Sequence, residues 1–191
     1  MRKRAVLRGR GGLFPALAVL FLAEVNLEAT TLVYLPFEKQ CSEAKVIVVA
    51  RAVKQISAWD ETRSRIYTDT DFSVEEAVKG GISGSLTVRY LGGTVGELAQ
   101  SVAGSPSFTV GSKYVLFLEP GSGGRYRVVG FSQGCYQVLS ESGGKATVKP
   151  QLASAEGVRI LGGGKAKAVG LLTLREFLAQ VRAQIDRDNK K

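Results

Sequence analysis

Hydrophobic and polar residues alternate along the centre of the chain with the two-residue period of β-strands. In residues 66–75, isoleucine, threonine, phenylalanine and valine side chains point one way, and tyrosine, aspartate, serine and glutamate side chains point the other. Residues 86–90 alternate in the same manner, and a one-residue slip in register would expose their whole apolar set. The unbroken β-branched run at 46–49 is typical of a strand buried on both faces. The segment 44–93 therefore predicts three successive strands at the centre of the fold.

Further short strands are predicted after the glycine- and serine-rich connection at 92–111. Residues 114–118 form the most apolar of them, and turns separate it from strands at 126–129, 135–139 and 145–149. Many short strands with regular turn signals, and helices only at the margins, favour a small Greek-key barrel or sandwich. We predict a mainly β fold, with an OB-fold-like barrel of five to six antiparallel strands in residues 30–150.

Two helices are predicted, one near each end of the barrel sequence. The first is a short helix at 35–45. The second covers 173–188, because Thr173 and Glu176 form a capping-box pair that is followed by an apolar stripe at helical spacing. The stripe consists of Leu174, Phe177, Leu178, Val181 and Ile185. This helix is too short for a coiled-coil seam and is expected to pack on the barrel. The glycine- and lysine-rich segment 151–172 is expected to be an extended or mobile connection.

The first 29 residues have the three parts of a secretory signal peptide. Five basic residues precede an apolar run at 13–23, and Ala29 then offers a small-residue cleavage position that leaves Thr30 as the new terminus. The alternative is a retained transmembrane helix, but the run is shorter than the roughly 20 residues that spanning requires. We therefore predict that residues 1–29 are cleaved, that the protein is periplasmic or secreted, and that it keeps no stable membrane anchor.

Composition narrows the functional classes. The chain has 191 residues, with 26 Lys and Arg, 17 Asp and Glu and no histidine, and a formal charge of +9. Outside the first 29 residues, 21 basic and 15 acidic residues remain, which permits acidic partners without requiring them. The lack of histidine removes the commonest general base and every Ser–His or Cys–His catalytic pair. Two cysteines are too few for a four-thiolate zinc site. We predict no catalytic residue, no metal and no cofactor, and a protein that is not an enzyme.

Cys41 and Cys135 are the sharpest candidate pair in the sequence. Cys41 recurs with Phe37 and Ala44 at helical spacing, so it is expected to face inward. Two inward-facing cysteines in an oxidising compartment favour one disulfide, which would join the first helix to a late strand. Closing so long a loop would contribute on the order of 4 kcal/mol in the chain-entropy account of disulfides. The alternative is two buried free thiols.

Aromatic and basic side chains on the predicted strands and loops can form one ligand face, which combines base- or ring-stacking surfaces with positive charge. The candidates are Trp59, in a polar loop predicted at 57–64, and Tyr67, Arg89, Tyr90 and Arg125. The alternative is that these aromatic rings pack in the core or at its rim. Nucleic acid is not expected as the ligand, because export removes the usual partners.

A calcium site is a weaker candidate. Asp69 and Asp71 lie close together on one predicted strand, and Asp60 and Glu61 lie in the adjacent loop. Calcium takes six or more oxygen ligands, and strand alternation already explains Asp69 and Asp71 as solvent-facing residues. The solvent face is therefore favoured, and no metal ligand is assigned.

Five segments resemble a family of small exported bacterial proteins of unknown function: AKVIVVARAV, RIYTDTDFSVEEAVKG, LTVRYLGG, PSFTVGSKYVLFL and YRVVGFSQGCYQV. The likeness covers about residues 30–140, and the final helix also fits it. These proteins look like the OB-fold barrel of the tissue inhibitors of metalloproteinases and of netrin modules. The resemblance implies protease binding, but those inhibitors hold the protease zinc through an amino-terminal cysteine. Here the predicted terminus is Thr30 and Cys41 lies eleven residues further, so that mechanism does not transfer.

Three functions follow as expectations. The first is an exported, non-enzymatic binding domain that engages a protein partner, such as a secreted protease, through loops on a rigid β scaffold. The second is an envelope protein that binds an acidic polysaccharide or another polyanion through a basic face. A hydrolase that uses Asp69 and Asp71 alone ranks last, because paired carboxylates need a pocket between them.

Overall fold

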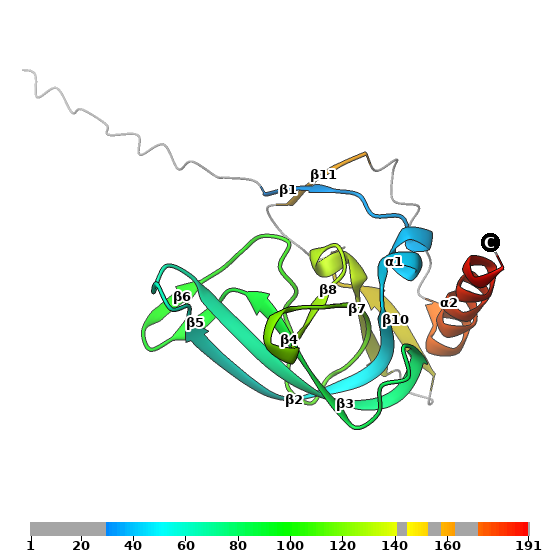
Figure 1. The fold of residues 1–191 in the computed structure, drawn as a ribbon, viewed down its shortest axis with the longest axis horizontal. Helices are drawn as coiled ribbons and strands as arrows, with labels where there is room; N and C mark the ends of the chain where they lie inside the picture. Colours follow the sequence, from blue (N-terminus) through cyan, green and yellow to red (C-terminus); the bar gives the residue numbers. More distant parts are fainter. Residues whose placement is uncertain (1–29, 141–144, 153–157, 163–171, 191) are drawn as a thin grey trace, which may run out of the picture.

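A computed structural model describes residues 30–140, 145–152, 158–162 and 172–190 of the chain (Figure 1). Its centre is a barrel whose strand order around the wall is β2, β3, β4, β8, β7 and back to β2. These strands are β2 (Val46–Trp59), β3 (Ile66–Lys79), β4 (Ser85–Leu91), β7 (Lys113–Pro120) and β8 (Tyr126–Val128). Neighbours are antiparallel except β4 and β8, which meet in parallel at Val88 and Tyr126. The predicted OB-fold-like barrel is confirmed, and its closure through one parallel bridge makes it a mixed barrel.

Strands outside the barrel form three additions. The sheet continues past β7 through β9 (Cys135–Ser140), β10 (Ala146–Pro150) and β12 (Leu172–Thr173). A separate hairpin consists of β5 (Gly93–Val95) and β6 (Leu98–Gln100), and β1 (Thr30–Val33) pairs in parallel with β11 (Val158–Leu161). β11 lies where the sequence predicts only a connection, because nothing local in a glycine- and lysine-rich segment indicates that its partner is the first strand. The predicted signal peptide lies outside the described residues.

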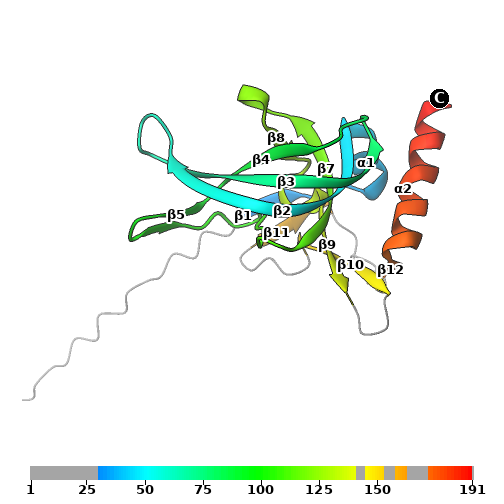
Figure 2. The same ribbon diagram turned by 90° about the horizontal axis from the view of Figure 1, so that it is seen from below.

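Both predicted helices are present, as α1 (Phe37–Glu43) and α2 (Leu174–Asn189). The capping box that begins α2 is formed as expected: Glu176 N donates to Thr173 Oγ1 at 3.3 Å, and Thr173 N donates to Glu176 Oε2 at 3.0 Å. α2 packs against α1, β10 and β12 on one flank of the molecule (Figure 2). None of the helices in the described ranges is long and apolar enough to cross a membrane.

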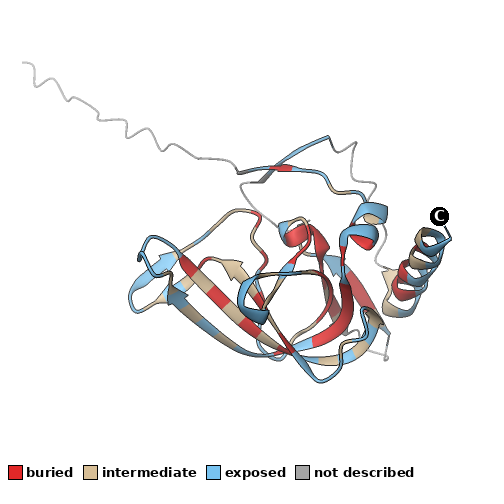
Figure 3. Ribbon diagram, in the orientation of Figure 1, coloured by how far each residue is buried: buried red, intermediate tan, exposed pale blue. Residues whose placement is uncertain are grey.

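Two hydrophobic cores share the wall that β2 and β7 form (Figure 3). Side chains alternate across this wall, so that one set fills the barrel and the other lies beneath the helices. The lumen core receives Val46, Val48, Tyr114, Leu116 and Leu118. The helix-layer core receives Ile47, Val49, Val115 and Phe117. The unbroken apolar run at 46–49 is therefore buried on both faces, as its composition predicts.

One amide side chain ties β1 to the barrel. Gln133, in the 3₁₀ turn η2 (Phe131–Gly134), accepts a hydrogen bond from Leu35 N at 2.7 Å and donates one to Val33 O at 3.0 Å. On the other side of the strand, Tyr34 N donates to Leu161 O at 2.8 Å. Main-chain groups on both edges near the end of β1 thus have hydrogen-bond partners without a further strand.

The disulfide predicted between Cys41 and Cys135 is wrong, because both residues are free and fully buried. The sheet separates them. Cys135 pairs with Leu116 and shares its orientation toward the lumen core, whereas Cys41 lies in the helix-layer core. Inward orientation is correct for each cysteine, but this fold has two interiors and the sequence does not say which one a residue enters. The alternative of two buried thiols is the one observed.

Both thiols are expected to be unreactive until the protein unfolds. Burial raises the pKa of Cys41 to about 12 and also raises the pKa of Cys135, so almost no reactive thiolate forms near pH 8. Mass spectrometry after alkylation at pH 8, without reductant, should show an unmodified folded chain and two adducts per chain in urea. A chain that takes up no alkylating agent in urea until reductant is added would contradict the free thiols.

Candidate binding groove

A groove of about 890 Å³ crosses the outer side of β3 and β4, between the β2–β3 turn and the β7–β8 turn. We call it the β3–β4 groove. Residues at and after the end of β8 also line it, among them Val128, Gly130 and Phe131. Its volume falls within the range of about 300–1,000 Å³ that is usual for ligand sites. The fold therefore provides a concave surface of useful size at this place.

All five residues of the predicted binding face line this groove. Trp59 ends β2, Tyr67 lies on β3, Arg89 and Tyr90 lie on β4, and Arg125 follows the β7–β8 turn. The sequence predicts a loop at Trp59, but β2 runs through this residue because Ala58 and Trp59 pair with the start of β3. Tyr90, however, packs against the lumen core, with its ring centre 5.4 Å from that of Phe108 and its hydroxyl bonded by Gln55 Nε2 at 3.3 Å. All five candidates border the groove, Tyr90 from the lumen side, and binding at the groove stays a prediction.

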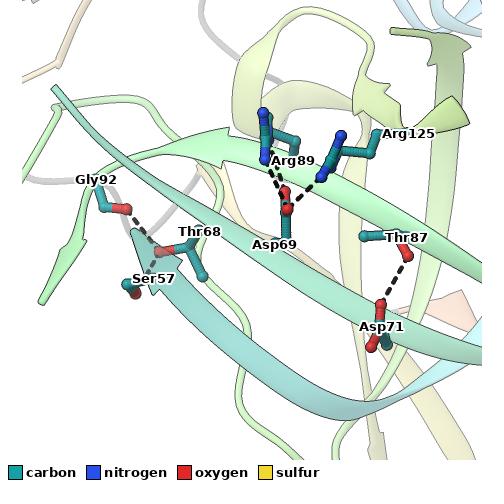
Figure 4. A network of polar contacts seen from close by, with 8 residues as sticks. All are labelled: Ser57, Thr68, Asp69, Asp71, Thr87, Arg89, Gly92 and Arg125. Carbon is teal, nitrogen blue, oxygen red and sulfur yellow. Dashed lines mark hydrogen bonds and ion pairs between the residues drawn. The ribbon is translucent and has the colours of Figure 1, made fainter. Parts of the chain in front are cut away.

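Three of the residues that line the groove form an ion-paired cluster (Figure 4). Asp69 and Arg89 lie opposite each other in the β3–β4 register. Arg89 donates from Nε to Asp69 Oδ1 and from Nη2 to Asp69 Oδ2, both at 2.7 Å, and Arg125 Nε donates to Asp69 Oδ2 at 2.9 Å. The cluster therefore fixes both guanidinium groups on one carboxylate.

The cluster stays charged at neutral pH. Burial alone would raise the pKa of Asp69, but hydrogen bonds and positive charge from Arg89 and Arg125 outweigh it and hold this pKa below its usual value. The hydrogen bond to Asp69 raises the pKa of Arg89 further. Arg89 also lies over the ring of Tyr67, 5.6 Å from its centre. Two cations and one anion leave a net charge of one positive unit at the centre of the groove.

The remaining charges lie around this centre and most have partners of their own. Arg127 pairs with Glu119 at 3.3 Å. Asp60 accepts hydrogen bonds from Ser64 N at 2.7 Å and Ser64 Oγ at 2.9 Å, which closes the β2–β3 turn. Glu61 is exposed at the rim. Three arginines and four carboxylates thus line the groove, so it is not a basic surface.

Apolar side chains form the walls. Ile56 is 53% exposed and Phe131 is 43% exposed, and the ring of Trp59 is half-buried. Phe131 has a backbone φ of 60°, a left-handed conformation that costs free energy in a residue with a side chain. Exposed apolar groups around a charged centre are the usual composition of a ligand site.

A second polar network fixes the strands beneath the groove (Figure 4). The hydroxyls of Ser57 and Thr68 are 2.8 Å apart, and Thr68 Oγ1 donates to Gly92 O at 2.6 Å. These bonds join the ends of β2, β3 and β4, which gives the groove a rigid floor.

Asp69 and Asp71, the weaker candidates for a calcium site, have other partners. Asp69 is held by two arginines, and Asp71 accepts a hydrogen bond from Thr87 Oγ1 at 2.7 Å. Within the described ranges, no group of three or more His, Cys, Asp or Glu residues could hold a metal ion. Both carboxylates are therefore used in cross-strand contacts.

Sequence reasoning did not assign Ile56, Arg127 or Phe131 to a binding face, and it took Asp69 as a solvent-facing strand residue. The outward orientation of Asp69 on its strand was available from the alternation, and Arg89 shows the same orientation one strand later. What the pattern did not reveal is the register that places the two opposite each other. For Phe131, an aromatic residue between Gly130 and a Ser-Gln-Gly turn was the signal for a ring held at the surface.

Comparison of the chain with protein-family models gives no match, and comparison with curated proteins also gives none. Its function must therefore be inferred from the fold and the groove.

Proposed function

We propose that this protein is an exported, non-enzymatic binding domain that holds a segment of a partner protein in the β3–β4 groove. The observation that carries this proposal is the gathering of Trp59, Tyr67, Arg89 and Arg125 in one concave surface together with the exposed Ile56. Aromatic and arginine side chains in a pocket are the residues that most often anchor protein partners. A groove with apolar walls and a single charged centre suits an extended segment with mixed side chains.

The position of the groove supports a binding role by analogy with the fold. OB-fold barrels bind ligands on the face of their second and third strands, flanked by the turns after the first and fourth strands. Counted along the chain, the second and third barrel strands are β3 and β4, and the turns after the first and fourth are those after β2 and β7. Fold analogy alone does not define a ligand. A secreted protease as the partner rests on the resemblance to inhibitor barrels and belongs to the same proposal.

The charges of the groove count against the two other functions. A polyanion would meet four carboxylates and three arginines, of which Arg127 is already paired with Glu119. A hydrolase would need Asp69 as a free acid or base, but two arginines hold it and depress its pKa. A polyanion-binding protein would instead show salt-dependent retention on an anionic polymer that substitutions in the groove do not alter.

Site-specific photo-crosslinking in the cells that produce the protein tests the proposal. A photoreactive side chain at Phe131 should give a discrete adduct with another protein, and Ile56→Glu should reduce its yield about tenfold or more, since the change buries a charge at the groove wall. The matched control is Val53→Glu, because Val53 is 49% exposed on the same strand but does not line the groove. Equal adduct yields in the two variants, or no protein adduct at all, would overturn the proposed function.

A further inference from the structure

We infer that the β3–β4 groove recognises its ligand through a single carboxylate, which binds between the guanidinium groups of Arg89 and Arg125. This inference rests on the proposed function, because it names the chemical group that the groove accepts. The ligand is then a peptide segment that carries one aspartate, glutamate or terminal carboxylate beside apolar residues.

The first support is the set of donors that the cluster leaves unused. Arg125 bonds Asp69 through Nε alone, and Arg89 through Nε and Nη2, so among the described residues no hydrogen bond joins a carboxylate to either terminal nitrogen of Arg125. The side chains of Arg89 and Arg125 are 34% and 36% exposed. A guanidinium group has donors in a planar fork that matches a carboxylate. The unused N–H groups of both arginines can therefore donate hydrogen bonds to a second carboxylate.

The second support is the room beside Arg125. A Cβ atom added at Gly123 would lie 2.7 Å from Arg125 Nη1. The guanidinium group of Arg125 therefore lies close to the glycine of the turn, and a side chain at this position would force it to move. Gly123 also has a φ of 64°, so the turn itself favours glycine. The short turn thus leaves room for the guanidinium group in the position in which it binds Asp69.

The third support is the charge balance. Asp69 cancels one of the two positive charges, so the cluster can hold one more carboxylate before it becomes neutral. A second ligand carboxylate would be repelled, because Asp60 and Glu61 also line the groove. Asp69 acts as the positioning residue: it fixes the orientation of both guanidinium groups and limits the ligand to a single negative charge.

Titration of the full chain with sodium acetate, followed by the NMR signals of the arginine Nε–Hε groups, tests the inference. Acetate should shift the signals of Arg89 and Arg125, whereas acetamide and an equal concentration of sodium chloride should leave them unchanged. Arg125→Gln should weaken acetate binding about tenfold or more through the lost charge-assisted hydrogen bonds. Equal shifts with acetamide or chloride would overturn the inference.

Arg182→Gln is the matched control for that titration. It removes the same charge from an arginine that is also paired with one carboxylate, that of Glu76, but Arg182 does not line the groove, so acetate affinity should change less than about twofold. Arg125→Lys provides a second variant if the first unfolds: it keeps the charge but loses the planar fork, and binding should again weaken several-fold. Similar losses in the Arg182 and Arg125 variants would show a non-specific charge effect and overturn the inference.

The source of the carboxylate is resolved with short peptides. The first pair is a seven-residue peptide with a central glutamate and the same peptide with glutamine at that position. The second pair is an apolar peptide with a free carboxyl terminus and the same peptide with an amidated terminus. Preference for the glutamate peptide assigns a side chain, and preference for the free terminus assigns a chain end. Peptides that bind with equal affinity in charged and neutral form would overturn the inference. The titrations need no partner protein, so they can fail while the crosslinking experiment succeeds, or the reverse.

Discussion

Replacing Phe117 with alanine is expected to lower the free energy of unfolding by about 3–5 kcal/mol. Phe117 lies on β7 with no exposed surface, and its ring contacts three others in the helix-layer core. The ring centres of Phe37, Tyr136 and Phe177 are 6.2, 5.6 and 6.3 Å from that of Phe117. The resulting cavity cannot close without movement of both helices, because these rings come from α1, β9 and α2. Urea unfolding monitored by circular dichroism measures the loss.

Phe131→Ala is the matched control for this prediction. It removes the same atoms from a ring that is 43% exposed in the wall of the groove. Alanine has the same backbone restrictions as phenylalanine at a positive φ, so the strain there is unchanged. The expected loss is below about 1 kcal/mol. If both variants lost the same stability, the helix layer would not be a packed core around Phe117.

Gly93→Ala is expected to cost about 2–4 kcal/mol of unfolding free energy, from backbone strain and overpacking together. Gly93 has a φ of 135°, a conformation that residues with a Cβ rarely adopt. An added Cβ would overlap Thr68 Oγ1 and would lie 2.5 Å from Ser57 Oγ. These hydroxyls form the hydrogen-bonded floor of the groove and cannot separate without breaking their mutual contact. The same urea titration measures the change.

Gly96→Ala separates the cost of backbone strain from the cost of overpacking. Gly96 lies in the same hairpin connection with a φ of 61°, but an added Cβ there would have no heavy atom within 4 Å. Its replacement should cost only about 1 kcal/mol, the strain of a side chain at positive φ. The difference between the variants is the cost of overlap with the two hydroxyls. A Gly93 variant no less stable than the Gly96 variant would rule out close packing at the groove floor.

Local periodicity was enough to predict the barrel strands and the faces of their residues. Phe72 and Val88 point inward as their alternation predicts, and the capping box at Thr173 begins α2. These features depend on neighbours within a few residues, so one strand or helix carries the whole signal. The outward orientation of Tyr67 and Arg89 follows from the same rule, as does the opposite orientation of Tyr90, which follows Arg89 on the strand and packs against the lumen core.

Features that depend on long-range pairing could not be predicted in this way. Arg125 reaches Asp69 across 56 residues of sequence, and the contact depends on both the β3–β4 register and the course of the β7–β8 turn. The two cysteines were each placed inside, yet only the pairing of Cys135 with Leu116 shows that it lies in the lumen. Periodicity tells which residues face inward and does not distinguish one interior from the other.

The wall shared by the two cores determines which parts of the molecule unfold together. Tyr114, Leu116 and Leu118 face the lumen, while Val115 and Phe117 on the same strand face the helices. Because the two cores share β7, we expect them to unfold together and the amide hydrogens of this strand to exchange through global unfolding. The β1–β11 ribbon lies outside this wall and is expected to open separately, at lower free energy.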